Sequence, residues 1–197
     1  DRESFVVAKK QGSEGGSDLA GPNAGRGGAV LAFVTGLWLA LLQFSHFFLL
    51  EVWLTSRATT FFVALFFWLV GFLAGLQAGG RKSFPLLVVV AAAGYYVSFG
   101  LLALWPFKLA MLPAAGLCIA FGGAAAGAFF PFAEARFTRV KWLLFHENNG
   151  FVLGIFGALL GAVFEGRWLL MWAPGIGAAA VLREAPLRSY HDGDALM

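Results

Sequence analysis

Long apolar runs separated by short charged segments fill residues 28–182 of this chain. The hydrocarbon core of a bilayer is about 30 Å thick, so a helix needs about 20 consecutive apolar residues to cross it. A transmembrane barrel would instead show alternating segments of about 10 residues. The sequence therefore predicts an all-α integral membrane protein with about six transmembrane helices.

The predicted spans are residues 28–54, 59–78, 84–105, 109–132, 142–164 and 166–182. The last span is the shortest and contains Pro174, so we expect it to be tilted, kinked or partly re-entrant. Residues 1–27 form a Gly-rich polar tail that we expect to be flexible, and residues 183–197 form a second, short tail. Hydrophobic residues make up 59% of the chain and charged residues 13%, which leaves no room for a soluble domain.

Basic residues are distributed unequally between the two sides of these spans. All but three of the 14 Lys and Arg residues lie in the two tails and in the loops around Arg81 and Arg139; the exceptions are Arg57, Lys108 and Arg167. Because Lys and Arg in short loops stay on the cytoplasmic side, both ends are predicted to be cytoplasmic. The membrane we expect is the inner membrane of a bacterium. The basic residues flank spans and do not form one continuous face, so nucleic acid is not an expected partner.

Small residues recur at helical spacing inside three of the predicted spans. This spacing lets helix backbones approach closely where lipid provides no hydrophobic drive for association. We expect these faces to form contacts within the bundle more than a dedicated dimer seam. The residues are Gly71, Gly75 and Gly79, then Gly123 and Gly127, then Gly150, Gly154, Gly157 and Gly161.

Polar residues inside a span are costly unless they pair or meet water, so they are candidate functional residues. In the first span Gln43 and His46 lie on one broad face, with Glu51 at its edge, and they could form a small polar pocket. The alternative is that Glu51 extends to the membrane interface while Gln43 and His46 bond neighbouring helices.

A denser polar cluster, His146, Glu147, Asn148 and Asn149, lies near the start of the fifth span. Four successive side chains point all around a helix, so some must meet neighbouring helices. Two interpretations stay open: a buried polar site, or a helix that begins near Asn149 with residues 141–145 lying along the interface.

Cofactor chemistry finds little support in the sequence. His46 and His146 should differ in depth by roughly 15 to 20 Å at 1.5 Å per residue, too far to share a haem iron. Haem held by one histidine and another ligand is the weaker alternative, and we expect no cofactor and no metal. The single cysteine, Cys118, allows no disulfide framework, and no catalytic motif occurs, so we expect no enzyme activity.

Four stretches point to one family: Leu50-Glu51-Val52-Trp53, Gly71-Phe72-Leu73-Ala74-Gly75 with Gly79-Gly80-Arg81, Gly127-Ala128-Phe129-Phe130-Pro131-Phe132-Ala133, and Asn148-Asn149-Gly150 with Gly154. They resemble the membrane domain of spermidine-synthase-like integral membrane proteins. In that family a soluble aminopropyltransferase-like domain often follows the membrane part. Residues 183–197 are too short for such a domain, so the resemblance implies the membrane fold without aminopropyl transfer.

Two functions remain as hypotheses. The first is a non-catalytic membrane subunit that packs against or anchors partner proteins, other subunits or a second copy of itself, in a larger complex such as an energy-converting assembly. The second is a small transporter that acts as a homodimer, because six helices with both ends inside resemble one half of a larger transporter, with three helices followed by three of inverted topology.

Overall fold

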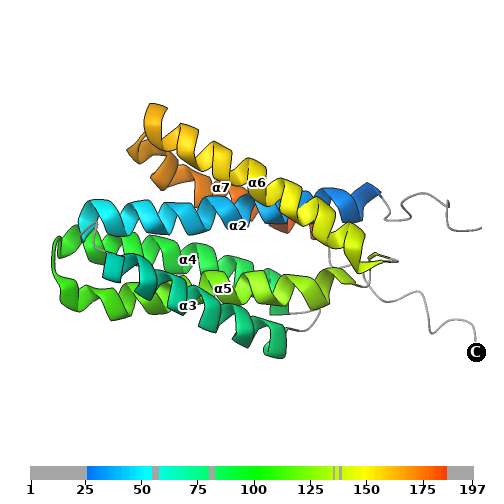
Figure 1. Ribbon diagram of the computed structural model, residues 1–197, viewed down its shortest axis with the longest axis horizontal. Coiled ribbons are helices and arrows are strands. Elements are labelled where there is room, and N and C mark those ends of the chain that lie inside the picture. Colours follow the sequence, from blue (N-terminus) through cyan, green and yellow to red (C-terminus); the bar gives the residue numbers. More distant parts are fainter. Residues whose placement is uncertain (1–25, 55–57, 80–82, 135, 138, 186–197) are drawn as a thin grey trace, which may run out of the picture.

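The computed structural model describes residues 26–54, 58–79, 83–134, 136–137 and 139–185, and these are almost entirely helical (Figure 1). No strand occurs in these ranges, which confirms the all-α prediction. Most of the two predicted tails, residues 1–25 and 186–197, lies outside the described residues. The helices are α2 (Arg26–Trp53), α3 (Ala58–Ala78), α4 (Ser83–Leu104), the short 3-10 helix η1 (Leu109–Met111), α5 (Leu112–Glu134), α6 (Val140–Phe164) and α7 (Arg167–Glu184).

Five of these helices, α2 to α6, are long and apolar enough to cross a membrane. The sixth, α7, is an 18-residue helix that includes Pro174. At 1.5 Å per residue it is about 27 Å long, and it packs against α2 and α4. The last predicted span is therefore one helix of the bundle, shorter and less apolar than the other five.

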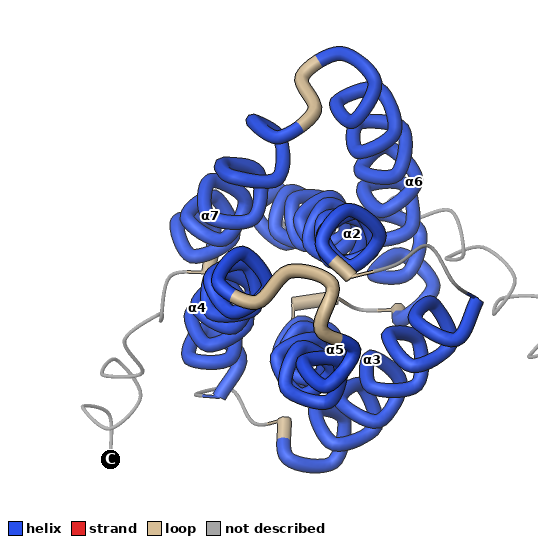
Figure 2. Tube along the Cα trace, turned by 90° about the vertical axis from the view of Figure 1, so that its left-hand side faces the viewer, coloured by secondary structure: helices blue, strands red, loops and turns tan. Residues whose placement is uncertain are grey.

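The helices form two layers of three (Figure 2). In one layer α2 lies at the centre and packs against α6 and α7; in the other α5 lies at the centre and packs against α3 and α4. The layers meet where α2 contacts α4 and α5 and where α4 contacts α7. The two central helices are consequently the most covered, and the four flanking helices present more of their surface outward.

The two halves of the chain contribute to the two layers in opposite ways. Successive helices alternate in direction, so α5 runs opposite to α2 (Figure 1). The first half, α2 to α4, supplies the centre of one layer and both flanks of the other; the second half, α5 to α7, does the reverse. The two halves therefore have matching roles in opposite orientation (Figure 1). Each half therefore packs mainly against the other half.

Glycines make the closest crossing within the α3–α5–α4 layer. A Cβ atom at Gly71 would overlap the carbonyl oxygen of Ala120, and a Cβ atom at Gly127 would overlap that of Phe72. Only a residue without a side chain allows backbones to approach this closely. Gly75 and Gly123 make equivalent contacts between α3 and α5, and Gly79 meets Pro131.

Glycines also make the close crossing between α2 and α6. A Cβ atom at Gly150 would overlap the Phe33 carbonyl oxygen, and one at Gly154 would lie 2.6 Å from the Leu37 carbonyl oxygen. On α2, Gly36 fits against the carbonyl of Glu147, a contact that the sequence patterns did not identify. The structure separates Gly157 and Gly161 from this crossing: Gly157 is exposed, and Gly161 meets the side chain of Leu169 on α7.

Candidate functional site

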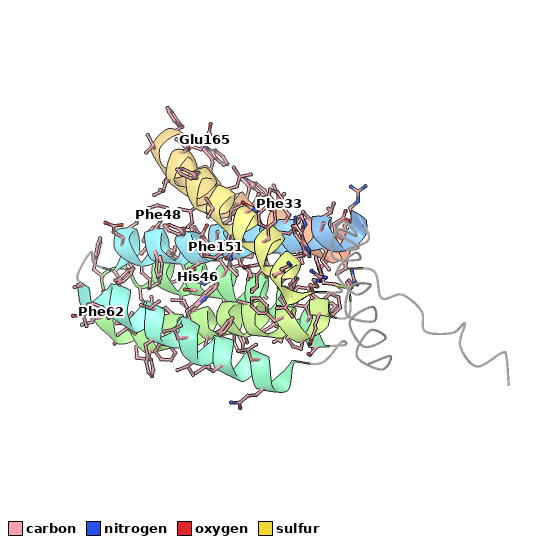
Figure 3. The ribbon with its side chains drawn as sticks, turned by 45° about the vertical axis from the view of Figure 1, so that its right-hand side comes forward. Phe33, His46, Phe48, Phe62, Phe151 and Glu165 are labelled. Atoms are coloured by element: carbon pink, nitrogen blue, oxygen red, sulfur yellow. The ribbon has the colours of Figure 1, made fainter. Side chains whose placement is uncertain are left out.

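The polar residues of α2 do not gather into the pocket that their spacing allowed. His46 is 1% exposed and lies inside the bundle, unlike the peripheral Phe62 (Figure 3). Gln43 is half-buried, and Glu51 is exposed near the end of the helix. Of the three residues, only His46 faces the interior, because it alone lies on the side of α2 that packs against the other layer.

His46 contacts Tyr95 of α4 between the two layers. The imidazole Nδ1 lies 3.0 Å from the Leu42 carbonyl oxygen one turn earlier, so Nδ1 donates this bond and Nε2 carries the lone pair. The Tyr95 ring meets the imidazole edge to face, with ring centroids 5.0 Å apart. Nε2 is buried and has no hydrogen-bond partner within the described ranges.

Buried hydroxyl groups accompany this imidazole on the two helices. Ser45 precedes His46 on α2, and Ser98 lies one turn beyond Tyr95 on the buried face of α4. Neither serine oxygen has a partner in the described part of the chain. Sequence reasoning missed Tyr95 and Ser98, although a tyrosine and a serine three positions apart in an apolar span are the signal that marks them.

An imidazole lone pair and two hydroxyls can accept or donate hydrogen bonds to water or to a small polar solute. Leaving such groups buried and unpaired costs about 1 to 3 kcal/mol each. Within the described ranges no group of three His, Cys, Asp or Glu side chains could hold a metal ion. The chemistry available between the layers is therefore hydrogen bonding and proton exchange.

The cluster from His146 to Asn149 lies inside α6, which begins at Val140. The interpretation that the helix begins near Asn149 is wrong, since residues 141–145 already belong to its first turns. The helix distributes the four side chains: Glu147 is 8% exposed, His146 is half-buried, and both asparagines are exposed. Glu147 lies on the same buried face as Leu143 and Gly150, toward α2.

The two histidines lie at different depths of the bundle. The Glu147 carbonyl packs against Gly36, and His46 lies ten residues further along α2, about 15 Å at the rise of a helix. The ring of His146 contacts Phe145 and Phe137, with centroid distances of 5.4 and 6.4 Å. The two imidazoles therefore cannot ligate one iron.

Asn148 and Asn149 face outward from a helix that is otherwise apolar on that side. The Asn149 Nδ2 donates to the Phe145 carbonyl oxygen at 2.7 Å, which satisfies one of its two N–H groups. Further along the same helix Val152, Leu153, Phe156 and Leu160 are each more than half exposed. We call these six side chains the outer face of α6.

The described part of the chain is all-helical, with five helices long and apolar enough to span a membrane, a polar contact between its layers and an outward polar pair on α6. No protein-family model matches the chain, and no curated protein or solved structure matches it either. The resemblance to spermidine-synthase-like membrane domains stays a prediction that rests on its four short motifs.

Proposed function

We propose that this chain is a non-catalytic, multi-pass membrane subunit that packs against a partner protein through the outer face of α6. The observation that carries the proposal is the exposure of Asn148 and Asn149 inside an apolar span. Asn149 is the tenth residue of α6, so it lies about 14 Å from the start of the helix. At that depth an amide facing lipid is unfavourable, whereas a neighbouring helix can hydrogen-bond it.

The position of α6 in the bundle supports this use. Only 22% of the most apolar stretch of α6 is buried inside the chain, compared with 50% for α2. This is the lowest share among the five candidate spans. Its buried side is taken up by the glycine crossing with α2. The opposite side combines large apolar side chains with two amides, a composition suited to helix packing in a membrane.

A photoactivatable side chain at Leu153 tests this proposal. Leu153 lies one turn beyond Asn149 and is 51% exposed; Leu73 on α3 is 57% exposed and serves as the matched control. In native membranes the probe at Leu153 should cross-link to a polypeptide and the probe at Leu73 to lipid. Asn149→Leu should reduce the cross-link. Lipid adducts alone at both positions would contradict the proposal, and the mass of the product distinguishes a second copy from another chain.

A second candidate is a small transporter built from a homodimer of such bundles. The inverted arrangement of the two halves, with unpaired polar atoms of His46 and Ser98 between the layers, favours it. If the layers rock against each other, His46 would be exposed to each side in turn. Proton uptake into vesicles that contain a pH-sensitive dye should then occur and should be lost in His46→Leu.

Trp172→Phe provides the control for that measurement, since Trp172 is 56% exposed on α7 and lies outside the contact between His46 and Tyr95. Uptake that is equal in vesicles with and without the protein would exclude proton transport by it.

A further inference from the structure

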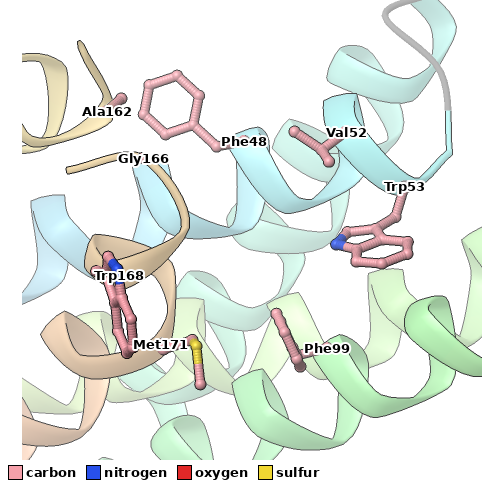
Figure 4. Close-up of a pocket in the computed structure, with 8 residues that line it drawn as sticks. All are labelled: Phe48, Val52, Trp53, Phe99, Ala162, Gly166, Trp168 and Met171. Carbon is pink, nitrogen blue, oxygen red and sulfur yellow. The ribbon is translucent and has the colours of Figure 1, made fainter. Parts of the chain in front are cut away.

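A cavity of about 700 Å³ opens at the end of the bundle where α2 ends. Its walls come from four helices and from the turn between α6 and α7 (Figure 4). The side chains that shape it are Phe48, Val52 and Trp53 of α2, Phe99 of α4, and Trp168 and Met171 of α7. None of them carries a charge, so the interior is almost entirely apolar.

The cavity exists because the joined ends of α6 and α7 lie away from α2 (Figure 1). Both helices pack mainly against α2, although they are consecutive in the chain and joined by a short turn. Gly166 makes that turn with φ of +52°, in the left-handed region that favours glycine. The joined end of the two helices leans away from α2 (Figure 1). Ala162 and Gly166, which are small, leave the space unfilled.

We propose that this cavity binds one acyl chain of a phospholipid. Phe48 and Val52 lie near the end of the candidate span Gly27–Trp53, and Ala162 lies near the end of Val140–Phe164. In a membrane the cavity would therefore lie toward one edge of the hydrocarbon, within reach of the acyl chain of a lipid. Its volume falls in the usual range of about 300 to 1,000 Å³ for small-molecule sites. An apolar chain fills such a space without loss of hydrogen bonds.

Three exposed charged residues lie close in the chain to the cavity wall or to a residue bonded to it. The Phe107 backbone N–H donates to the Trp53 carbonyl oxygen at 2.8 Å, and the exposed Lys108 follows Phe107 in the chain. The exposed Glu51 precedes Val52, and the exposed Glu165 precedes Gly166. A phosphate near Lys108 and an ammonium group near either carboxylate would complement these charges, which favours a zwitterionic phospholipid such as phosphatidylethanolamine.

Native mass spectrometry of the detergent-purified chain tests the site. Ala162→Trp fills the cavity, and Ala93→Trp, at an exposed position of α4, adds the same side chain outside it. The unchanged chain and Ala93→Trp should retain one phospholipid per chain, and Ala162→Trp should lose it. Equal lipid retention in all three chains, or none in the unchanged chain, would overturn the proposal.

A second measurement keeps the proposal testable if Ala162→Trp fails to fold. Bromine on an acyl chain quenches indole fluorescence on contact. The protein is therefore placed in vesicles of dibrominated dioleoyl-phosphatidylethanolamine, and these vesicles are then mixed with excess unbrominated vesicles. Trp168 lines the cavity and is 51% exposed, so the part of its quenching that comes from the cavity, obtained as the difference from Trp168→Phe, should persist after mixing. Quenching of Trp172, which is 56% exposed and outside the cavity wall, should recover at once. Equally fast recovery of both would show only exchanging lipid at the surface.

Discussion

The indole Nε1 of Trp38 on α2 donates a hydrogen bond of 3.0 Å to the carbonyl oxygen of Pro174 on α7. Trp38 is fully buried, and its indole fits against α7 because Gly177 has no side chain. A Cβ atom at Gly177 would clash with the indole. A second bond, from the Tyr96 hydroxyl to the Met171 carbonyl oxygen at 2.9 Å, ties α7 to α4. These contacts hold the least apolar helix in the bundle.

Trp38→Phe should lower the stability of the bundle measurably. The substitution removes a buried hydrogen bond, worth about 1 kcal/mol, and leaves the Pro174 carbonyl facing an apolar ring. Thermal unfolding of the purified protein in detergent measures the effect. The control is Trp172→Phe on α7, the helix that contains Pro174. Trp172 is 56% exposed, so this variant should leave the unfolding temperature almost unchanged. Equal shifts for both variants would show that the Trp38 bond contributes nothing.

Gly154→Leu should disturb the α2–α6 crossing far more than Gly157→Leu. A side chain at Gly154 meets the Leu37 carbonyl oxygen and Ala40, whereas at Gly157 the nearest side-chain atom is 4.0 Å away. Forcing extra atoms into a packed contact typically costs about 1 to 3 kcal/mol. Thermal stability in detergent separates the two variants, with Phe156→Leu as a further exposed control. If all three variants unfold at one temperature, α6 does not rely on a close glycine contact.

His146→Ala and Glu147→Gln test what the polar cluster of α6 does. Glu147 is buried against α2 and His146 contacts two aromatic rings, so both variants should lower stability or partner assembly while transport, if there is any, is unaffected. Accumulation in the membrane, assembly in mild detergent and vesicle uptake are measured together. Normal folding and partner binding combined with abolished uptake would reject the subunit function and favour the transporter.

Labelling of introduced cysteines tests the orientation inferred from the basic residues. In a Cys118→Ala background, a cysteine at Arg57 should react with a membrane-impermeant thiol reagent in intact cells, and a cysteine at Arg139 should react only after lysis. Cys118→Ala removes the native thiol, which is buried, so that only the introduced cysteine can react with the reagent. Labelling at position 139 and not at 57 in intact cells would reverse the topology.

Much of the fold follows from the sequence because span length and composition are local properties. The six predicted spans coincide with α2 to α7 within a few residues at each end, and the glycines of α3 and α5 were identifiable from their spacing alone. Spacing could not show which partner each glycine meets. Gly157 matches the pattern as well as Gly154 does, yet only Gly154 lies where the backbones of α6 and α2 approach closely.

The candidate sites divide in the same way. The sequence marked His46 and the cluster from His146 to Asn149, since any polar group in an apolar span stands out. It could not indicate that Tyr95 lies beside His46, because α2 and α4 meet only when both layers are assembled.

The sequence by itself determined that the chain is helical and membrane-like, since hydrocarbon thickness and helix rise fix the length of a span. Tertiary structure alone decided that α2 joins α6 and α7 while α5 joins α3 and α4. It likewise decided which polar side chains face inward and where a cavity remains. The physical reason is that apolar helices have no strong sidedness of their own, so close packing against specific neighbours selects the face that each one buries.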